Sequence, residues 1–245
     1  MNILLTNDDG IKHPGILHLK KELEKEHRVI VLAPQSQRSA FSHNISIHNS
    51  IRIHKLDEDI YETDGTPADC VKFGVIGFLK EKIDFVASGI NLGPNMGIDV
   101  FYSGTVAAAR EGLINKIPSA AFSLNVWKKE PNFAAAAKEA VKIIDILTSK
   151  YYKNNEMYNV NFPNTDTFKG IKVTKLGKRV YNEVLIQRQD PIGKDYYWLG
   201  GEFPGYRNEE GTDFNAVENG YVSITPLSLD ITYNKVYDEI RSDFD

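Results

Sequence analysis

Two apolar runs joined by an amphipathic stretch open the chain, and this pattern restricts the possible folds more than any other feature. Residues 2–7 form the first run, which ends in a polar Asn-Asp-Asp-Gly turn, and residues 28–33 form the second. Between them, residues 15–26 distribute leucine and isoleucine among lysine and glutamate with the spacing of an amphipathic helix. Such a βαβ unit predicts a parallel sheet with a right-handed crossover.

Strand and helix patterns continue to alternate along most of the chain. Residues 51–63 alternate weakly, as in a hairpin. The sequence Thr66-Pro67-Ala68-Asp69 combines a capping residue, proline at the first helical position and an acid three residues after the cap, so we expect a helix to about Lys82. Later segments predict strands at 83–87, 118–124 and 158–162 and helices at 106–115 and 132–150. The expected fold class is α/β, with a Rossmann-like parallel-sheet core over about residues 1–164.

The last part of the chain, about residues 165–245, differs in composition. It is richer in Tyr, Trp, Gly and Pro, which indicates hairpins followed by a terminal element. No clear linker separates it from the core, and the sequence contains no internal repeat. We therefore predict one domain over residues 1–245, made of the core and a C-terminal β-rich extension.

Charge and cysteine content exclude some classes of partner and compartment. A formal net charge of -4 provides no basic surface for long nucleic acid or an anionic membrane. Cys70 is the only cysteine, so an intramolecular disulfide is impossible. The first residues lack the pattern of a signal peptide and no apolar run reaches membrane-spanning length, so we expect a cytoplasmic protein. All six histidines lie within the first 54 residues, so a metal site elsewhere must use oxygen ligands.

Polar residues gather where three predicted strands end. The first group is Asp8-Asp9, the second is a loop with Arg38-Ser39, and the third runs from Ser88 to Asn95 and resumes at Ser103-Gly104-Thr105. In open α/β sheets, loops diverge and helix N-termini converge beyond the carboxyl ends of the strands, and ligands bind there. We therefore expect the three groups to form one site.

Two neighbouring carboxylates make this site suitable for a metal. Asp8 and Asp9 repel each other unless a cation offsets their charge. Mg²⁺ and Mn²⁺ prefer oxygen donors, and a serine hydroxyl and an asparagine amide can complete the set. Taken alone, Asp8-Asp9-Gly10 is equally typical of a turn with solvated acids or of a helix cap.

The helix start at Ser103-Gly104-Thr105 suits a phosphate. Its N–H groups and the positive end of the helix dipole favour anions, which offsets the acidic net charge locally. Simpler interpretations stay open for each residue: Ser39 as an ordinary loop hydroxyl, Asn91 and Asn95 as turn formers, and Ser103 as an N-cap alone. The convergence of these residues at one edge favours a site.

Several short motifs follow one another in an order and spacing that is hard to obtain by chance. They are Leu5-Thr6-Asn7-Asp8-Asp9-Gly10, Arg38-Ser39, Gly65-Thr66-Pro67-Ala68-Asp69-Cys70, Ser88-Gly89-Ile90-Asn91, Gly97, the run from Tyr102 to Gly112, Ile117-Pro118-Ser119, Asn159-Val160-Asn161-Phe162-Pro163 and Thr225-Pro226-Leu227. Together they span nearly the whole chain and resemble the SurE family of survival-protein nucleotidases.

The resemblance implies a 5'/3'-nucleotidase that releases phosphate from nucleoside monophosphates, with short polyphosphates as further substrates in some members. It implies one divalent ion per subunit, Mg²⁺ or Mn²⁺, with ligands at Asp8, Asp9, Ser39 and Asn91. Asn95 and Ser103, Gly104 and Thr105 match the phosphate-side loop of the family.

The resemblance also implies how the extension is used and where this chain departs from its relatives. It implies a C-terminal extension exchanged between the subunits of a homodimer or homotetramer. Ala40 stands where glycine is expected in many relatives, a departure that bears on nucleotide preference and leaves the metal ligands unchanged.

In the mechanism that we expect, a metal-activated water attacks phosphorus in line with the departing nucleoside oxygen. Asp8 or Asp9 orients that water as the catalytic residue. Backbone donors at Ser103 to Thr105, together with Asn95, stabilise the charge on the equatorial oxygens.

Two other functions share paired acids after the first strand. A haloacid-dehalogenase-like phosphatase forms a phosphoaspartate from an Asp-x-Asp motif, but Asn7 stands at the first acidic position if Asp9 is the second. A receiver-like signalling module, which is not an enzyme, needs a phosphoacceptor aspartate where this chain has Ser88 and Asn91. Both alternatives therefore require a departure from their usual motifs.

Overall fold

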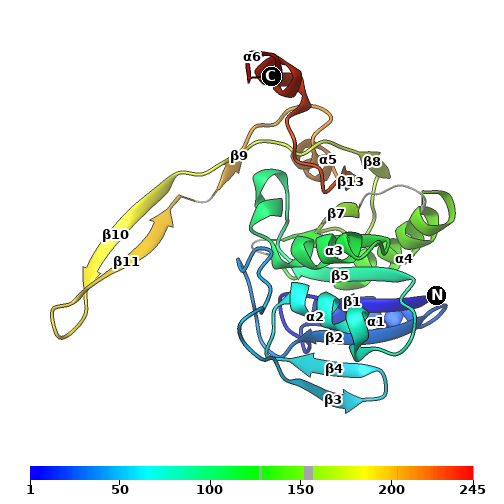
Figure 1. The fold of residues 1–245 in the computed structure, drawn as a ribbon. Helices are drawn as coiled ribbons and strands as arrows, with labels where there is room; N and C mark the ends of the chain where they lie inside the picture. The colour runs from blue at the N-terminus through cyan, green and yellow to red at the C-terminus, as the bar shows by residue number, and fades with distance from the viewer. Residues whose placement is uncertain (127–128, 152–156, 203, 245) are drawn as a thin grey trace.

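The computed structural model describes residues 1–126, 129–151, 157–202 and 204–244. Within these ranges the main feature is a nine-stranded sheet in the order β3-β4-β2-β1-β5-β6-β7-β13-β8 (Figure 1). Its central strands run parallel: β2 (Arg28–Pro34), β1 (Asn2–Thr6), β5 (Phe85–Leu92), β6 (Ser119–Asn125) and β7 (Met157–Pro163). The predicted α/β class with a Rossmann-like parallel core is confirmed.

Helices cover both faces of the sheet because successive side chains of a strand point to opposite sides. In β1, Ile3 and Leu5 pack into the core on one face, and Leu4 packs into the core on the other. The first face carries α1 (Pro14–Leu23) and α4 (Phe133–Lys150), and the second carries α2 (Pro67–Phe73) and α3 (Gly104–Ile114). The sheet is therefore buried between two helical layers, as the apolar strands require.

The two edges of the sheet are built differently. At one edge, β3 (Ile53–Asp57) and β4 (Ile60–Thr63) form the hairpin predicted for residues 51–63. At the other edge, β13 (Val222–Leu227) pairs antiparallel with β7, and β8 (Ile171–Val173) pairs parallel with β13. The last part of the chain thus adds two strands to the main sheet, which the composition of that segment did not predict.

The rest of the last part projects from the sheet. Strands β10 (Glu183–Gln189) and β11 (Asp195–Gly201) form a long hairpin that reaches away from the core (Figure 1). Short strands β9 (Arg179–Val180) and β12 (Gly205–Tyr206) pair at its base, followed by α5 (Asp213–Glu218) and the terminal α6 (Asn234–Phe244). In the described ranges, helices long and apolar enough to cross a membrane are absent.

The helix expected from Thr66 to about Lys82 is shorter than predicted. The capping box is present, since Thr66 and Asp69 exchange side-chain to backbone hydrogen bonds. The α-helical part ends at Phe73, and a π-helical turn over Gly74–Phe78 follows. Two glycines in five residues weaken the helix, and the backbone of Gly77 leaves the helical conformation.

Candidate metal and phosphate site

Asp8 and Asp9 follow the carboxyl end of β1 and are held by different elements. The Thr105 hydroxyl, in the first turn of α3, donates a hydrogen bond to Asp8 Oδ1. The Leu92 backbone N–H, at the end of β5, donates to Asp9 Oδ2 at 3.0 Å. The two carboxylates are thus tied to the two ends of the connection between β5 and α3.

Burial makes the negative charge of this pair costly. Only 4% of Asp8 is exposed. Burial raises the pKa of Asp8 to about 6, the Thr105 hydrogen bond acts to lower it, and the charge of Asp9 acts to raise it. Burial also raises the pKa of Asp9, opposed by the Leu92 N–H. A divalent cation would stabilise both anions, so the donor chemistry fits the ion that the resemblance implies.

His13 is the basic side chain that forms an ion-pair contact with this pair in the described part of the chain. Its Nδ1 lies 3.6 Å from Asp9 Oδ2. The same nitrogen accepts the Gly15 N–H at 3.1 Å, as the N-cap of α1, and therefore carries no proton. Burial lowers the pKa of His13, although the charge of Asp8 acts to raise it. The imidazole is neutral in this arrangement and does not balance the carboxylates.

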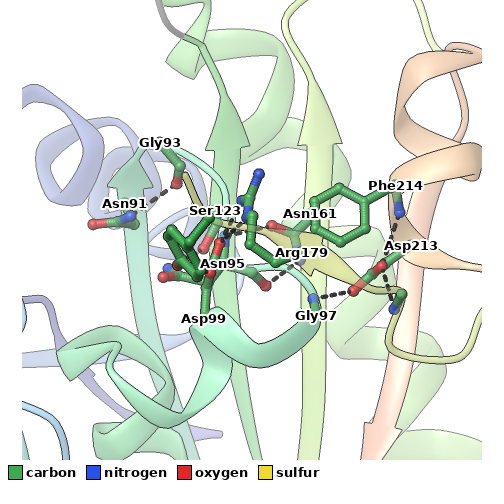
Figure 2. Close-up of polar contacts among 12 residues, drawn as sticks. Asn91, Gly93, Asn95, Gly97, Asp99, Ser123, Asn161, Arg179, Asp213 and Phe214 are labelled. Atoms are coloured by element: carbon green, nitrogen blue, oxygen red, sulfur yellow. Dashed lines mark hydrogen bonds and ion pairs between the residues drawn. The ribbon is translucent and has the colours of Figure 1, made fainter. Parts of the chain in front are cut away.

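A metal at this place needs ligands besides acids and imidazoles. Among the described residues, no three His, Cys, Asp or Glu side chains lie close enough together to hold an ion. Asn91, near the end of β5, donates from Nδ2 to the Gly93 carbonyl at 2.8 Å, which leaves its Oδ1 available (Figure 2). An amide oxygen of this kind suits Mg²⁺ or Mn²⁺.

Ser39 reaches the pair only through its neighbour in the chain. The Arg38 backbone N–H donates to the Asp8 carbonyl at 2.7 Å. Ser39 itself is exposed, and its Oγ accepts from Gln37 Nε2 at 2.9 Å. As a ligand, Ser39 would have to exchange that hydrogen bond for the ion.

The buried polar atoms near the pair that lack a partner within the described residues include Asn7 Oδ1 and Ser88 Oγ. The other amide atom of Asn7, Nδ2, donates to the Gly10 carbonyl at 2.9 Å and so shapes the turn that presents Asp8 and Asp9. A buried polar atom without a partner costs about 1–3 kcal/mol. Both atoms are therefore suited to water or an ion at this end of the sheet.

The first turn of α3 points at Asp8. Ser103 is the N-cap, and its Oγ accepts the Val106 N–H at 3.1 Å. A Cβ added to Gly104 would lie 3.0 Å from Asp8 Cβ, so glycine permits the close approach of the helix. With Thr105 bonded to the same carboxylate, the positive end of the helix dipole faces the acids and any phosphate bound beside them.

Asn95 is buried and bonds to strands other than the one that leads to the acids. It is 7% exposed, and its Nδ2 donates to Ser123 Oγ at 2.8 Å. Its backbone N–H donates to Asn161 Oδ1 at 2.9 Å, and its carbonyl accepts from Asn159 Nδ2 at 2.7 Å. The structure thus ties Asn95 to β6 and β7, and none of these contacts reaches Asp8 or Asp9.

The structure adds residues that sequence reasoning did not assign to the site. Leu92 contributes only a backbone N–H, for which a sequence carries no signal. Asn159 and Asn161 carry a recognisable signal in the sequence. They alternate with Val160 and Phe162, so two amides occupy one face of an otherwise apolar, buried strand. Buried amides are retained where they find hydrogen-bond partners, here the backbone of Asn95.

Comparisons with known proteins agree on one family. The family model described as "Survival protein SurE" matches residues 3–183. The "5'-nucleotidase SurE" of Clostridium beijerinckii is 44% identical over 100% of both chains, and that of Aquifex aeolicus is 46% identical over 97% of this chain and 96% of its own. The "5'/3'-nucleotidase SurE" of Wigglesworthia glossinidia brevipalpis is 41% identical over 100% of this chain and 98% of its own. Among solved structures, the SurE protein from Aquifex aeolicus matches with a TM-score of 0.88 at 44% identity over 100% of both chains.

Proposed function

Because the chain belongs to the SurE family, we propose that it is a divalent-metal-dependent 5'-nucleotidase that hydrolyses nucleoside 5'- and 3'-monophosphates to nucleoside and phosphate. The observation that carries the proposal is a pair of neighbouring carboxylates, of which the buried Asp8 packs against the N-terminus of α3. Such a place accepts a cation and a phosphate side by side.

Each proposed residue has a defined task. Asp8, Asp9, Asn91 and Ser39 would hold one Mg²⁺ or Mn²⁺ per subunit, and this ion would polarise the phosphoryl group and a water. Asp8 or Asp9 orients the attacking water in line with the departing nucleoside oxygen. The first turn of α3, at Ser103, Gly104 and Thr105, stabilises the charge on the phosphoryl oxygens.

Asn95 can supply a donor to the phosphate through its side-chain amide. Its Nδ2 donates one hydrogen to Ser123 Oγ and keeps a second N–H, and a phosphate oxygen requires such a donor. We propose this second N–H as the group of Asn95 that binds the phosphate.

Exposed apolar side chains on the projecting parts support the proposed assembly. The β10–β11 hairpin exposes Leu185, Trp198 and Leu199 to 69%, 64% and 72%, and α6 exposes Ile240 to 55%. Exposed apolar side chains gathered on projecting elements are typical of interfaces. We propose a homodimer or homotetramer in which the extension, about residues 165–245, exchanges its projecting β10–β11 hairpin and α6 between subunits, and a cytoplasmic enzyme whose further substrates include short polyphosphates.

A substrate panel tests the proposed activity. Phosphate release from 5'- and 3'-nucleoside monophosphates and from tripolyphosphate is measured with Mg²⁺, with Mn²⁺ and after chelation. Asp8→Asn and Asp9→Asn should each lower the rate by about 100-fold or more, since even second-sphere changes at metal sites cost about 10–100-fold. Asp57→Asn, on the exposed strand β3, is the matched control and should keep the full rate.

Three results would count against the proposal. Full phosphate release in thoroughly chelated protein would rule out the metal. A trapped phosphoaspartate on Asp8 or Asp9 would replace the water mechanism by the haloacid-dehalogenase-like one, and binding without turnover would favour the receiver-like module.

A further inference from the structure

The connection between β5 and α3, residues 93–103, is held by parts of the chain far away in sequence. Its two ends adjoin the groups that bind the carboxylates: Leu92 bonds to Asp9 on one side, and Thr105 bonds to Asp8 on the other. Any shift of this connection would therefore move Asn91 and the start of α3 relative to the acids.

Asp213 of α5 fixes the middle of the connection. Its Oδ2 accepts the Gly97 N–H at 2.8 Å, across 116 residues of sequence. Its Oδ1 accepts the N–H groups of Gly177 and Phe214, both at 2.8 Å. The side chain is fully buried, so three backbone N–H donors replace the water that would otherwise solvate this carboxylate. Two of these donors belong to other segments (Figure 2).

Arg179 of β9 fixes the next turn of the connection. Its Nε donates to Asp99 Oδ2 at 2.9 Å, and its Nη2 pairs with the same oxygen. The Tyr181 hydroxyl donates to the other oxygen of Asp99. Only 5% of the Arg179 side chain is exposed, and its guanidinium lies 4.6 Å from the centre of the Phe214 ring. A buried, doubly bonded pair of this kind has one geometry, unlike an exposed ion pair.

The connection packs so closely against the segment around Gly177 that both Gly97 and Gly177 must be glycine. Gly97 has a φ of +57°, and a Cβ there would lie 2.6 Å from the Gly177 carbonyl oxygen. A Cβ on Gly177 would lie 2.5 Å from the Phe214 ring. We use the name junction for the residues that make these contacts between the connection and the last part of the chain: Gly97, Asp99, Gly177, Arg179, Asp213 and Phe214.

We propose that Asp213 and Arg179 are positioning residues of the metal and phosphate site, acting through the connection that carries Asn91 at one end and the start of α3 at the other. This role rests on the proposed function. The last part of the chain then contributes to the reaction from within the same subunit, by setting where the Asn91 oxygen and the α3 N–H groups stand relative to Asp8 and Asp9.

The test compares Arg179→Gln, Arg179→Lys and Asp213→Asn with the full-length wild type. Arg28→Gln is the matched control, because Arg28 also bonds Asp59 in two places but lies at the opposite, amino end of β2. Three quantities are measured for each protein: amide hydrogen exchange of residues 93–103, Mn²⁺ affinity by calorimetric titration, and KM and kcat for a nucleoside monophosphate. The melting temperature is recorded beside them.

We expect Arg179→Gln and Asp213→Asn to speed exchange in residues 93–103, to weaken Mn²⁺ binding by about tenfold and to raise KM by a similar factor. Arg179→Lys should recover part of each loss, since it keeps the charge without the two-pronged geometry. Arg28→Gln should leave all three quantities unchanged, even if it lowers the melting temperature as much.

Two outcomes would overturn the proposal. Unchanged exchange in Arg179→Gln would show that the junction does not hold the connection. Faster exchange with unaltered Mn²⁺ affinity and KM would show a purely structural role. If Asp213→Asn does not fold, the two Arg179 variants decide. If wild-type protein binds Mn²⁺ but hydrolyses no nucleotide, the proposed function fails, and exchange and Mn²⁺ affinity still decide the positioning role.

Discussion

Two segments border the site, and they are held in opposite ways. Residues 35–41, with Ser39, are exposed apart from the half-buried Arg38. Residues 93–103 contain a buried stretch over 94–97, whose backbone N–H groups donate to β7 and α5, and they form an ion pair with β9. The difference indicates that, of the two proposed ligands, Asn91 is fixed in advance and Ser39 lies on an adaptable segment. Fixed ligands set geometry, and adaptable ones adjust to what binds.

Removing the ring of Phe214 should produce the largest loss of stability, because this ring lies in the junction that holds residues 93–103. Phe214 is fully buried, stacks on Tyr206 and lies under Arg179. Phe214→Ala should lower the free energy of unfolding by about 3–5 kcal/mol, because it leaves a cavity inside the junction. Phe41→Ala, on the 40% exposed ring of the other segment, should cost less than about 1 kcal/mol. Urea unfolding measures both, and similar losses would erase the contrast.

Two residues with nearly the same backbone φ should change stability in opposite directions when they are substituted. Gly97 and Ala40 have φ values of +57° and +58°. Gly97→Ala should cost about 2–5 kcal/mol, because left-handed backbone and overpacking against Gly177 add. Ala40→Gly should stabilise by about 0.5 kcal/mol, since relief of the left-handed alanine slightly exceeds the added entropy of the unfolded chain. Thermal and urea unfolding of the two variants check the signs, and equal signs would refute the comparison.

Loss of a fixed ligand should weaken metal binding more than loss of an adaptable one. Asn91→Ala should lower Mn²⁺ affinity by about 100-fold, while Ser39→Ala should lower it by about tenfold, because a water can replace the exposed hydroxyl. Calorimetric titration gives both constants, with Ser36→Ala as the control on the exposed segment. Equal losses would mean that exposure does not distinguish the two ligands.

The pH dependence of stability and of Mn²⁺ binding should follow the protonation of Asp8. Because folding raises the pKa of Asp8 from 3.8 to about 6, the folded chain binds this proton more tightly than the unfolded chain does. The metal-free protein should therefore lose stability as the pH rises from about 4 to about 6, and Mn²⁺ binding should weaken below pH 6, where protons compete with the ion.

One variant should shift the midpoint of Mn²⁺ binding against pH, and another should leave this midpoint unchanged. Thr105→Val removes the hydroxyl that lowers the pKa of Asp8, so the midpoint of Mn²⁺ binding against pH should move upward. Ser39→Ala should leave the midpoint unchanged, because Ser39 makes no contact with the Asp8 carboxylate among the described hydrogen bonds. Titration at a series of pH values separates the two, and a shift in Ser39→Ala alone would reverse the assignment.

Local patterns in the sequence predicted the elements that carry the acids. Apolar runs with an amphipathic helix between them predicted the parallel core and placed Asp8 and Asp9 after β1. The capping signals at Thr66 and Ser103 predicted two helix starts that the structure contains. These features depend on residues within about four positions of each other, where backbone geometry alone decides which side chains can meet.

Contacts between distant segments could not be predicted in the same way. The sequence did not indicate that β8 and β13 extend the main sheet, or that Gly97 would meet Asp213 across 116 residues. Which distant groups meet depends on how the strands are ordered in the sheet, and a carboxylate such as Asp213 looks in sequence like any other helix-start acid. The sequence by itself therefore determined the acids, the helix start and the fold class, while only the tertiary structure decided which buried donors hold the connection between them.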